Sequence, residues 1–207
     1  MNSKRFTILT VLFCTCLIAS NLFETKIFNA GPITLTGGFL VFPIAYILND
    51  CLTEVYGTKK ARFVIFLAVL MNLFVVTMAQ LVRILPPETY WTGQEHFDYI
   101  FEADLRITIA SMAAFLTGSL SNSQVMAKMK LRDGEKRFGW RAIASTLVGE
   151  SLDSLVFFPI AFWPEGWKNI IILMVTQVIL KTVYEILVLP FSSIFVRKLK
   201  EAEAQAE

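Results

Sequence analysis

The chain has 207 residues, of which 55% are hydrophobic and 17% are charged, and its formal net charge is +2 at pH 7. A soluble domain of this size carries roughly 25% charged residues, so the composition argues against a water-soluble fold. The small net charge says little by itself, and we expect no nucleic-acid partner.

The charged residues fall in short clusters between apolar runs of about 20 residues, the length that a helix needs to cross ~30 Å of hydrocarbon. In lipid such a run must be helical, because every backbone N–H and C=O needs a partner within its own segment. We therefore predict an all-α, polytopic membrane protein with six transmembrane helices, the second of which Asp50 interrupts. In chain order the predicted spans cover residues 6–23, 37–56, 63–82, 107–126, 142–163 and 170–196.

Basic residues are concentrated on one side of these spans. Of the 19 Lys and Arg residues, 14 lie before the first span, between the second and third, between the fourth and fifth, or after the sixth. The positive-inside rule then places both termini in the cytoplasm. We expect a multi-pass protein of a bacterial inner membrane, in which residues 1–200 form a single membrane domain and residues 201–207 a disordered cytoplasmic tail.

The only long connection between predicted spans covers residues 83–106. Pro86 and Pro87 end the third helix. Residues 92–95 have the spacing of a capping box, which predicts that a short helix begins there. Two roles stay open for this helix: it lies on the outer membrane surface, or it forms a lid over the substrate site.

Five ionisable residues sit inside predicted spans, where each costs roughly 3 kcal/mol at a helix centre. They are Asp50, Glu150, Asp153, Lys181 and Glu185. Such residues must face the bundle interior or a wet cavity and find partners there. Ion pairs that fix helix packing are the structural alternative, but four acids face one base, so pairing does not absorb them all. We interpret the group as a binding site.

Helical spacing places these residues on shared faces. Glu150 and Asp153 are three residues apart on the fifth span, and Phe157 continues that face. Lys181 and Glu185 are four residues apart on the sixth span.

Further polar residues extend the set. On the second span Asp50 shares a face with Tyr46, and Glu54 lies one turn beyond. Asn21 lies near the outer end of the first span and Asn122 on the fourth. Helix packing is the more usual role for such asparagines.

The excess of acids indicates a substrate that is rich in N–H donors or is a cation, because a carboxylate accepts two parallel hydrogen bonds from an amidine-like edge. Phe and Tyr rings, such as Tyr184 beside Lys181, stack on planar ring systems. We therefore expect a flat substrate.

The same segments carry a family resemblance. The motifs are residues 42–46 (FPIAY), 49–50 (ND), 53–57 (TEVYG), 60–62 (KAR), 149–154 (GESLDS), 157–162 (FFPIAF) and 181–185 (KTVYE), together with Pro190 and residues 20–23 (SNLF). Over nearly the whole chain the sequence resembles the vitamin uptake transporter family, in particular its bacterial queuosine precursor transporters.

The resemblance implies an alternating-access carrier that imports a 7-deazaguanine, either 7-cyano-7-deazaguanine or its aminomethyl analogue, for salvage into the tRNA nucleoside queuosine. It implies that a carboxylate of Glu150, Asp153 or Glu185 takes the N1–H and 2-amino edge of this base, and Glu150 and Asp153 are the first candidates. The substrate-binding candidates are Glu150, Asp153, Glu185, Lys181, Asp50, Tyr46, Phe157, Tyr184 and Asn21. The gating or structural candidates are Glu54, Arg62 and Asn122.

The absence of two sequence motifs bears on energy coupling and on the alternative function. No GxxxxGK loop is present, so the chain does not itself hydrolyse ATP. Proton transport by buried carboxylates and facilitated diffusion both stay open. The alternative function is a substrate-binding subunit of an energy-coupling-factor importer, but such subunits usually carry small residues four apart on the first helix, where this chain offers only Ala19 and Ser20.

An enzyme is not expected, because the single histidine, His96, lies in an outer loop. The three cysteines fall in predicted spans and form no metal motif or disulfide framework. We expect no cofactor and no metal. The expected partners are a purine-like small molecule and membrane lipid, and the oligomeric state stays open between a monomer and a homodimer.

Overall fold

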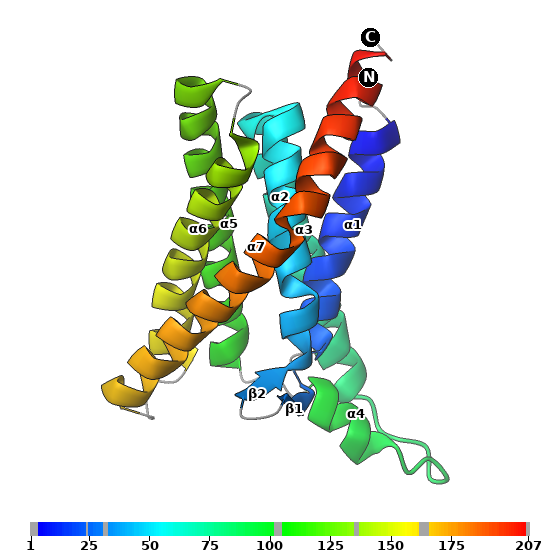
Figure 1. The fold of residues 1–207 in the computed structure, drawn as a ribbon. Helices are drawn as coiled ribbons and strands as arrows, with labels where there is room; N and C mark the ends of the chain where they lie inside the picture. Colours follow the sequence, from blue (N-terminus) through cyan, green and yellow to red (C-terminus); the bar gives the residue numbers. More distant parts are fainter. Residues whose placement is uncertain are drawn as a thin grey trace.

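The computed structural model describes residues 4–23, 25–30, 33–101, 105–134, 137–161 and 166–205. These residues form seven α-helices, two short strands and one 3-10 helix, and the long helices make a bundle that α7 crosses diagonally (Figure 1). In chain order the elements are α1 (Lys4–Phe23), β1 (Ile27–Ala30), β2 (Ile33–Thr36), η1 (Gly37–Leu40), α2 (Phe42–Tyr56), α3 (Thr58–Arg83), α4 (Gln94–Phe101), α5 (Leu105–Asp133), α6 (Phe138–Ala161) and α7 (Trp167–Ala204).

Five segments of the described chain are long and apolar enough to cross a membrane, which makes this a multi-pass membrane protein. They are Lys4–Phe23, Gly37–Tyr56, Thr58–Arg83, Phe138–Ala161 and Met174–Ala204. They match five of the six predicted spans, including the one that contains Asp50. The remaining prediction, residues 107–126, lies within α5, a helix of 29 residues that is not among the five.

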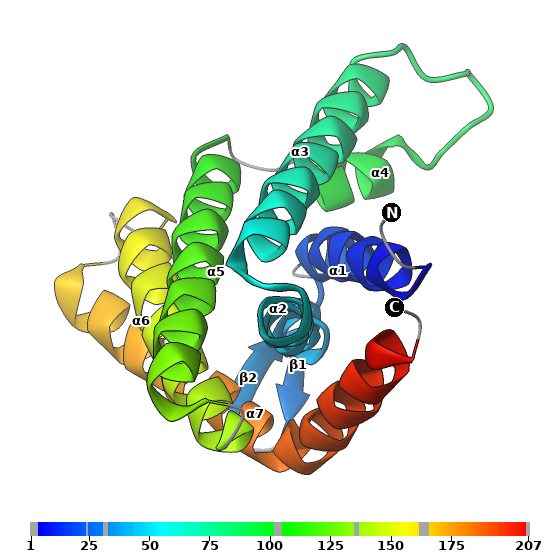
Figure 2. The ribbon, with the colours of Figure 1, turned by 90° about the horizontal axis from the view of Figure 1, so that it is seen from above.

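The polar character of α5 has a structural reason. Ser119, Asn122 and Ser123 are buried, and α5 packs along α6 and also contacts α2 and α3. Viewed along the bundle, α5 lies between α6 and α3 (Figure 2). Its polar side chains therefore meet other helices instead of lipid, and they lower its hydropathy without exposing polar groups to hydrocarbon.

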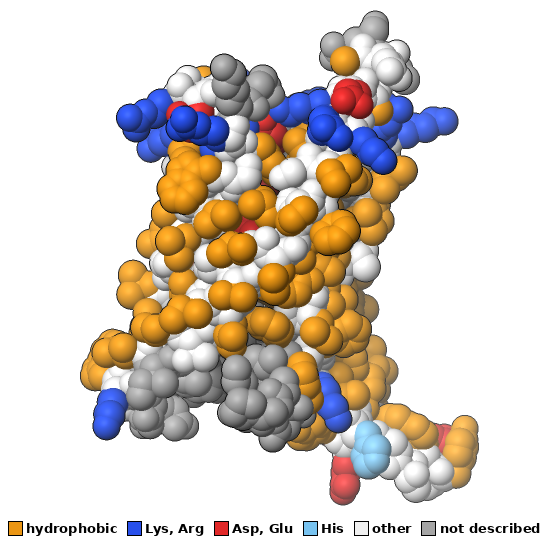
Figure 3. All heavy atoms as spheres, viewed as in Figure 1, with side chains coloured by type: hydrophobic (Ala, Val, Ile, Leu, Met, Phe, Trp, Pro, Cys, Tyr) orange, Lys and Arg blue, Asp and Glu red, His pale blue; other side chains and the backbone are white. Residues whose placement is uncertain are grey.

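The apolar residues divide between an internal core and an outer surface. On α1 the buried side chains are Phe6, Leu9, Phe13 and Leu17, which recur at helical spacing and face the bundle. On α3, by contrast, large apolar side chains such as Phe74 are exposed. Figure 3 shows a broad hydrophobic belt across the middle of the face that it draws. This is the surface expected of helices in contact with lipid.

The first residues of α1 and the last residues of α7 meet at one end of the bundle, here called the terminal end (Figure 1). The Arg5 side chain donates a hydrogen bond of 2.7 Å to the Ala202 carbonyl oxygen. The Tyr56 hydroxyl donates one of 3.1 Å to Glu203 Oε1. These contacts explain why α7 stays helical to Ala204, inside the segment for which the composition predicted a disordered tail.

The opposite end carries two small elements. Strands β1 and β2 pair antiparallel, with Ile27 opposite Thr36 and Ala30 opposite Ile33. The sequence predicted only a loop here, so this hairpin is an addition to the predicted all-α fold. The short helix predicted after residues 92–95 is confirmed as α4, which begins at Gln94.

Helix α4 is held against the end of α3. Gln80 Nε2 donates a 2.7 Å hydrogen bond to the Phe101 carbonyl oxygen, and Arg83 Nε lies 3.6 Å from Asp98 Oδ1. Seen from above, α4 lies beside α3, on the side of the bundle away from α6 (Figure 2). This position favours the surface role over the lid, because α4 does not cover the region between α2, α6 and α7.

Candidate functional site

Six of the predicted residues meet inside the bundle, where α2, α6 and α7 pack together. We call this the central cluster, which consists of Tyr46, Asp50, Glu150, Asp153, Lys181 and Glu185. Its acids are almost fully buried: Glu150 is 0% exposed, Asp50 2%, Glu185 3% and Asp153 7%. Four carboxyl groups and one ammonium thus share one interior site, which the spacing along single helices did not by itself establish.

Lys181 is the cation of this cluster. Its Nζ lies 2.8 Å from Glu150 Oε2 and 3.9 Å from Asp153 Oδ2. It also lies 4.3 Å from the centroid of the Phe42 ring, which is a cation–π distance. Glu150 Oε1 and the Tyr46 hydroxyl make no hydrogen bond with any part of the chain that the structure describes. Lys181 therefore neutralises charge on one side of the cluster, whereas buried polar atoms remain without hydrogen-bond partners in the described residues.

Asp50 and Glu185 form the second acidic pair of the cluster. They come from α2 and α7 and interact directly with each other. The Ser145 hydroxyl donates a weak hydrogen bond of 3.4 Å to Asp50 Oδ1, and Thr146 interacts with Glu185. Small hydroxyl side chains of α6 thus contact this pair, whereas the ammonium of Lys181 lies beside Glu150 and Asp153.

Glycines allow the helices to approach closely around Tyr46. A Cβ atom on Gly118 of α5 would lie 2.5 Å from the Tyr46 hydroxyl oxygen and 2.9 Å from the Gly149 carbonyl oxygen. A Cβ atom on Gly149 of α6 would lie 3.0 Å from Tyr46 Cε1 and 2.9 Å from Asn122 Cβ. Because a side chain fits at neither position, these glycines let α5 and α6 approach Tyr46 closely, and its hydroxyl lies beside the acids.

Asn122, a gating or structural candidate, belongs to a buried polar contact between α2 and α5. Asn49 Nδ2 donates hydrogen bonds to Asn122 Oδ1 at 2.9 Å and to the Ser119 carbonyl oxygen at 3.0 Å. Thr53 and Ser123 continue the contact toward the terminal end, with 2.9 Å between their hydroxyl oxygens. These bonds hold α2 against α5. Asn122 also interacts with Asp50 and donates a 3.3 Å hydrogen bond to the Thr146 hydroxyl, so it contacts the central cluster as well.

A second ionic group, the Glu54 cluster, lies at the terminal end. It consists of Glu54 of α2, Lys130 of α5, Arg141 of α6 and Lys200 of α7. Glu54 Oε1 lies 2.6 Å from Lys200 Nζ, 2.8 Å from Arg141 Nη2 and 3.4 Å from Lys130 Nζ. Lys130 also donates a 2.6 Å hydrogen bond to the Glu54 carbonyl oxygen. One fully buried carboxylate thus ties four helices together.

Arg62, another gating or structural candidate, does not pair with Glu54 in the described residues. Arg62 is exposed on α3, and the cations within salt-bridge distance of Glu54 are those of α5, α6 and α7. Sequence reasoning treated Arg141 as a loop charge, although its side chain is 0% exposed. One feature of the sequence could have predicted a cation beside Glu54. This residue lies at the end of its span where the basic residues gather, and a buried carboxylate there needs a cation.

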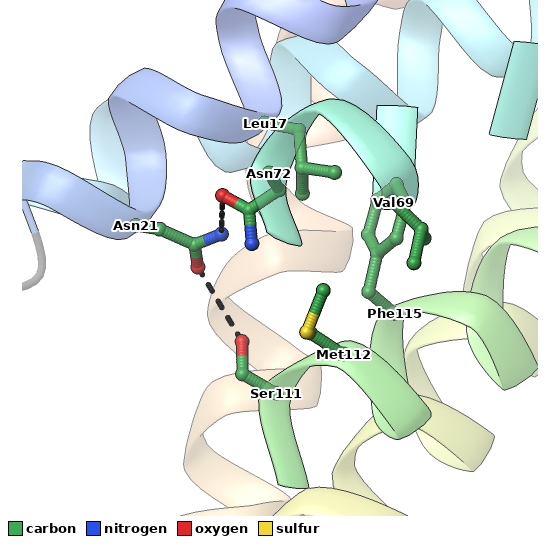
Figure 4. Close-up of a pocket in the computed structure, with 7 residues that line it drawn as sticks. All are labelled: Leu17, Asn21, Val69, Asn72, Ser111, Met112 and Phe115. Atoms are coloured by element: carbon green, nitrogen blue, oxygen red, sulfur yellow. Dashed lines mark hydrogen bonds between the residues drawn. The ribbon is translucent and has the colours of Figure 1, made fainter. Parts of the chain in front are cut away.

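Asn21 lies apart from the central cluster, in a narrow pocket between α1, α3 and α5 (Figure 4). Its Nδ2 donates a 3.0 Å hydrogen bond to Asn72 Oδ1, and its Oδ1 accepts a long one of 3.4 Å from Ser111. The pocket has an empty volume of about 170 Å³ but is too narrow for a water molecule. The structure thus groups Asn21 with a helix-packing contact.

The two aromatic candidates are half-buried on α6 and α7. The Phe157 ring lies 5.2 Å from that of Phe158, and the Tyr184 ring lies 6.1 Å from that of Phe39. Tyr184 follows Lys181 by three residues, so both side chains project from the same side of α7. Phe42 was not predicted as a site residue, although it opens the 42–46 motif.

No group of His, Cys, Asp and Glu in the described residues is arranged to hold a metal ion. Bundled membrane-spanning helices around an acidic interior, with a cation-rich contact at one end, define a class of protein: a multi-pass membrane protein with a polar site buried in its helices. Residues 36–195 match the family described as "putative vitamin uptake transporter", and the chain belongs to this family.

Three curated relatives add to this assignment. A "probable queuosine precursor transporter" of Haemophilus influenzae is 32% identical over 133 residues, which is 62% of this chain and 52% of the relative. The "queuosine precursor transporter" of Escherichia coli is 30% identical over 129 residues, 62% of this chain and 55% of the relative. A "probable queuosine precursor transporter" of Bacillus subtilis is 24% identical over 180 residues, 84% of this chain and 77% of the relative.

The chain therefore spans about half the length of the first two relatives that it matches. No solved structure matches the chain with statistical significance. The relatives are transporters, which agrees with the expectation that the chain is not an enzyme.

Proposed function

We propose that this chain is a carrier that imports a queuosine precursor, 7-cyano-7-deazaguanine or 7-aminomethyl-7-deazaguanine, across the bacterial inner membrane by alternating access. The names of the relatives supply the substrate class. In this proposal the substrate binds at the central cluster, with Glu150 and Asp153 as its principal contacts. Lys181, Glu185, Asp50, Tyr46, Phe157 and Tyr184 complete the site.

The observation that carries this proposal is the state of Glu150. It is 0% exposed, its Oε2 lies beside Lys181, and its Oε1 accepts no hydrogen bond within the described chain. A buried polar atom without a partner costs about 1–3 kcal/mol. A planar base with adjacent N–H groups gives such a carboxylate two parallel hydrogen bonds, and the hydroxyl of Tyr46 is close enough to the acids to take part.

The proposed orientation puts the terminal end in the cytoplasm, with α5 as the sixth span. Lys and Arg side chains gather at this end, beyond the hydrophobic belt (Figure 3). The positive-inside rule assigns such an end to the cytoplasm. The Glu54 cluster then lies between the central cluster and the cytoplasm, where in this proposal it acts as the inner gate of the carrier.

The binding test uses the chain purified in detergent and measures the thermal shift and the affinity for both deazaguanines. We expect wild type to be stabilised by at least one of them. Glu150→Gln and Asp153→Asn should each lower the affinity by about 10- to 100-fold, the equivalent of a charge-assisted hydrogen bond. Glu95→Gln, in the exposed first turn of α4, is the matched control and should bind like wild type.

Equal affinity in wild type and both site variants would place the binding site elsewhere. Uptake into vesicles that contain only this chain then tests the carrier. If purified protein binds the base but reconstituted vesicles take up none, the chain is a binding subunit that needs a partner.

A further inference from the structure

Lys181 has an unusually complete set of neighbours for an ion-paired lysine. Its ammonium meets the Glu150 carboxylate at 2.8 Å, the Asp153 carboxylate at 3.9 Å and the face of the Phe42 ring at 4.3 Å. These three groups come from α6 and α2, and Lys181 reaches them from α7. The side chain is 12% exposed, so the ammonium is largely removed from solvent.

Two carboxylates and an aromatic face together make a binding site for an organic ammonium ion. The carboxylates supply charge and accept N–H hydrogen bonds, and the ring face attracts the cation through its quadrupole. One carboxylate is enough to neutralise a lysine. The second carboxylate and the ring indicate a site whose chemistry suits a cation in general, and which the protein's own lysine fills here.

We propose that Lys181 is an internal competitor: its ammonium occupies, in the empty carrier, the position that a positively charged group of the substrate takes on binding. This inference rests on the proposed function and names its substrate class. The site prefers a planar ring that carries a primary ammonium over a neutral analogue of the same shape.

The helix that carries Lys181 also offers the place to which the displaced ammonium moves. Glu185 is four residues further along α7, the spacing at which a lysine and a glutamate pair on one helix face. Glu185 is 3% exposed and faces the carboxyl group of Asp50 across the α2–α7 contact. The aminomethyl precursor then turns its ammonium group, instead of its N1–H and 2-amino edge, toward Glu150 and Asp153. When this ammonium takes the position of the Lys181 ammonium, Lys181 turns to the second acidic pair, and no ammonium is left unpaired in the bundle.

Two substitutions of Lys181 separate this role from the alternatives. Lys181→Met removes the competitor and should tighten binding of the cationic aminomethyl precursor about tenfold. Lys181→Arg keeps the charge but can hold a carboxylate with two parallel hydrogen bonds, so it should weaken binding of the same compound about tenfold. The neutral cyano precursor should gain less from Lys181→Met, and lose less from Lys181→Arg, than the aminomethyl precursor does. Wild type should bind the aminomethyl precursor more tightly than the cyano precursor.

Affinities are measured by calorimetry on the purified full chain. Loss of aminomethyl-precursor binding in Lys181→Met would overturn the inference, because removal of a competitor cannot abolish binding. So would equal affinities of the two precursors in wild type. If Lys181→Met does not fold, the Lys181→Arg comparison decides alone: unchanged or tighter binding of the cation contradicts the competitor role.

A second pair of probes separates the failure of this inference from that of the proposed function. Benzylamine is an aromatic methylammonium ion at neutral pH, and benzyl alcohol is its neutral counterpart. If wild type binds neither deazaguanine, the proposed function falls. In that case a gain in benzylamine binding in Lys181→Met, without a gain for benzyl alcohol, still supports the competitor, and the absence of such a gain refutes it.

Discussion

Replacing Glu54 by glutamine removes the one carboxylate that three cations share at the terminal end of the bundle. The change keeps the size of the side chain, so it tests charge with little effect on packing. After the change, Arg141 would remain at 0% exposure without the carboxylate that lies 2.8 Å away. Lys200, now 2.6 Å from the same oxygen, would also lose this carboxylate.

The magnitude follows from burial. Breaking a buried ion pair by removing one partner costs about 3–5 kcal/mol, because it leaves an uncompensated charge. The glutamine oxygen still accepts one hydrogen bond, which offsets about 1 kcal/mol. Lys130 and Lys200 are each about 30% exposed, so water still solvates their ammonium groups after the change. Most of the lost stability therefore comes from the buried Arg141. We expect Glu54→Gln to lower the free energy of unfolding by about 3 kcal/mol.

The measurement is an SDS titration of the purified protein in mixed micelles, with Glu203→Gln as the matched control. Glu203 also joins helices at the terminal end, but its side chain is 21% exposed and lies 3.5 Å from an Arg5 that is 44% exposed. A pair of this kind contributes about 1 kcal/mol or less. A Glu54→Gln variant no less stable than Glu203→Gln would refute the idea that Glu54 neutralises a buried arginine.

The same variant tests the gate through a natural reporter. Cys51 is 0% exposed on α2, three residues before Glu54 and therefore on the same side of the helix. With Cys14 and Cys16 replaced by serine, the rate at which a maleimide reagent labels Cys51 measures opening of the terminal end. We expect Glu54→Gln to raise this rate at least tenfold under conditions where the protein remains folded. An unchanged rate would show that the Glu54 cluster does not close the path to Cys51.

Two further substitutions test the packing that positions the site. Gly149→Ala would place a Cβ atom 3.0 Å from Tyr46 Cε1 and should destabilise the protein by about 1–3 kcal/mol. In the control Gly139→Ala, the new Cβ atom meets only the end of a flexible leucine side chain at 3.1 Å, so the loss of stability should be much smaller. Similar losses of stability for the two variants in the same titration would contradict the close approach of the helices at Gly149. Asn72→Leu removes the 3.0 Å hydrogen bond from Asn21 and should cost about 1 kcal/mol, and a stabilised variant would show that this contact contributes nothing.

The helices could be predicted from the sequence because the length of an apolar run is set by the bilayer. Each predicted span overlaps a long helix in the described residues, including the one that carries Asp50. The hairpin could not be predicted in the same way, because two strands of four residues are too short to show an alternating pattern. The sequence of residues 27–36 nevertheless contains a turn signal, Gly31 and Pro32, between the residues that form the two strands.

Pairing across helices was much harder to predict than position along them. Helical spacing predicts that Lys181 and Glu185 share a face, but it does not say which acid of another helix the ammonium meets. Glu54 and Lys200 are 146 residues apart in the chain. Their contact depends on how α7 crosses the bundle, and that arrangement follows from the packing of all the helices together.

The two ionic groups are linked by the helices that they share. On α2, Asp50 and Glu54 are one turn apart, about 6 Å along the axis. On α7, Lys181 belongs to the central cluster and Lys200 to the Glu54 cluster, and Pro190 lies inside the helix between them. A proline removes one backbone hydrogen bond and lets a helix bend there. A change in the pairing of Lys181 therefore acts on the same helix that holds Lys200 against Glu54. In this proposal, substrate binding at the central cluster and opening of the terminal end are coupled because both change the position of α7.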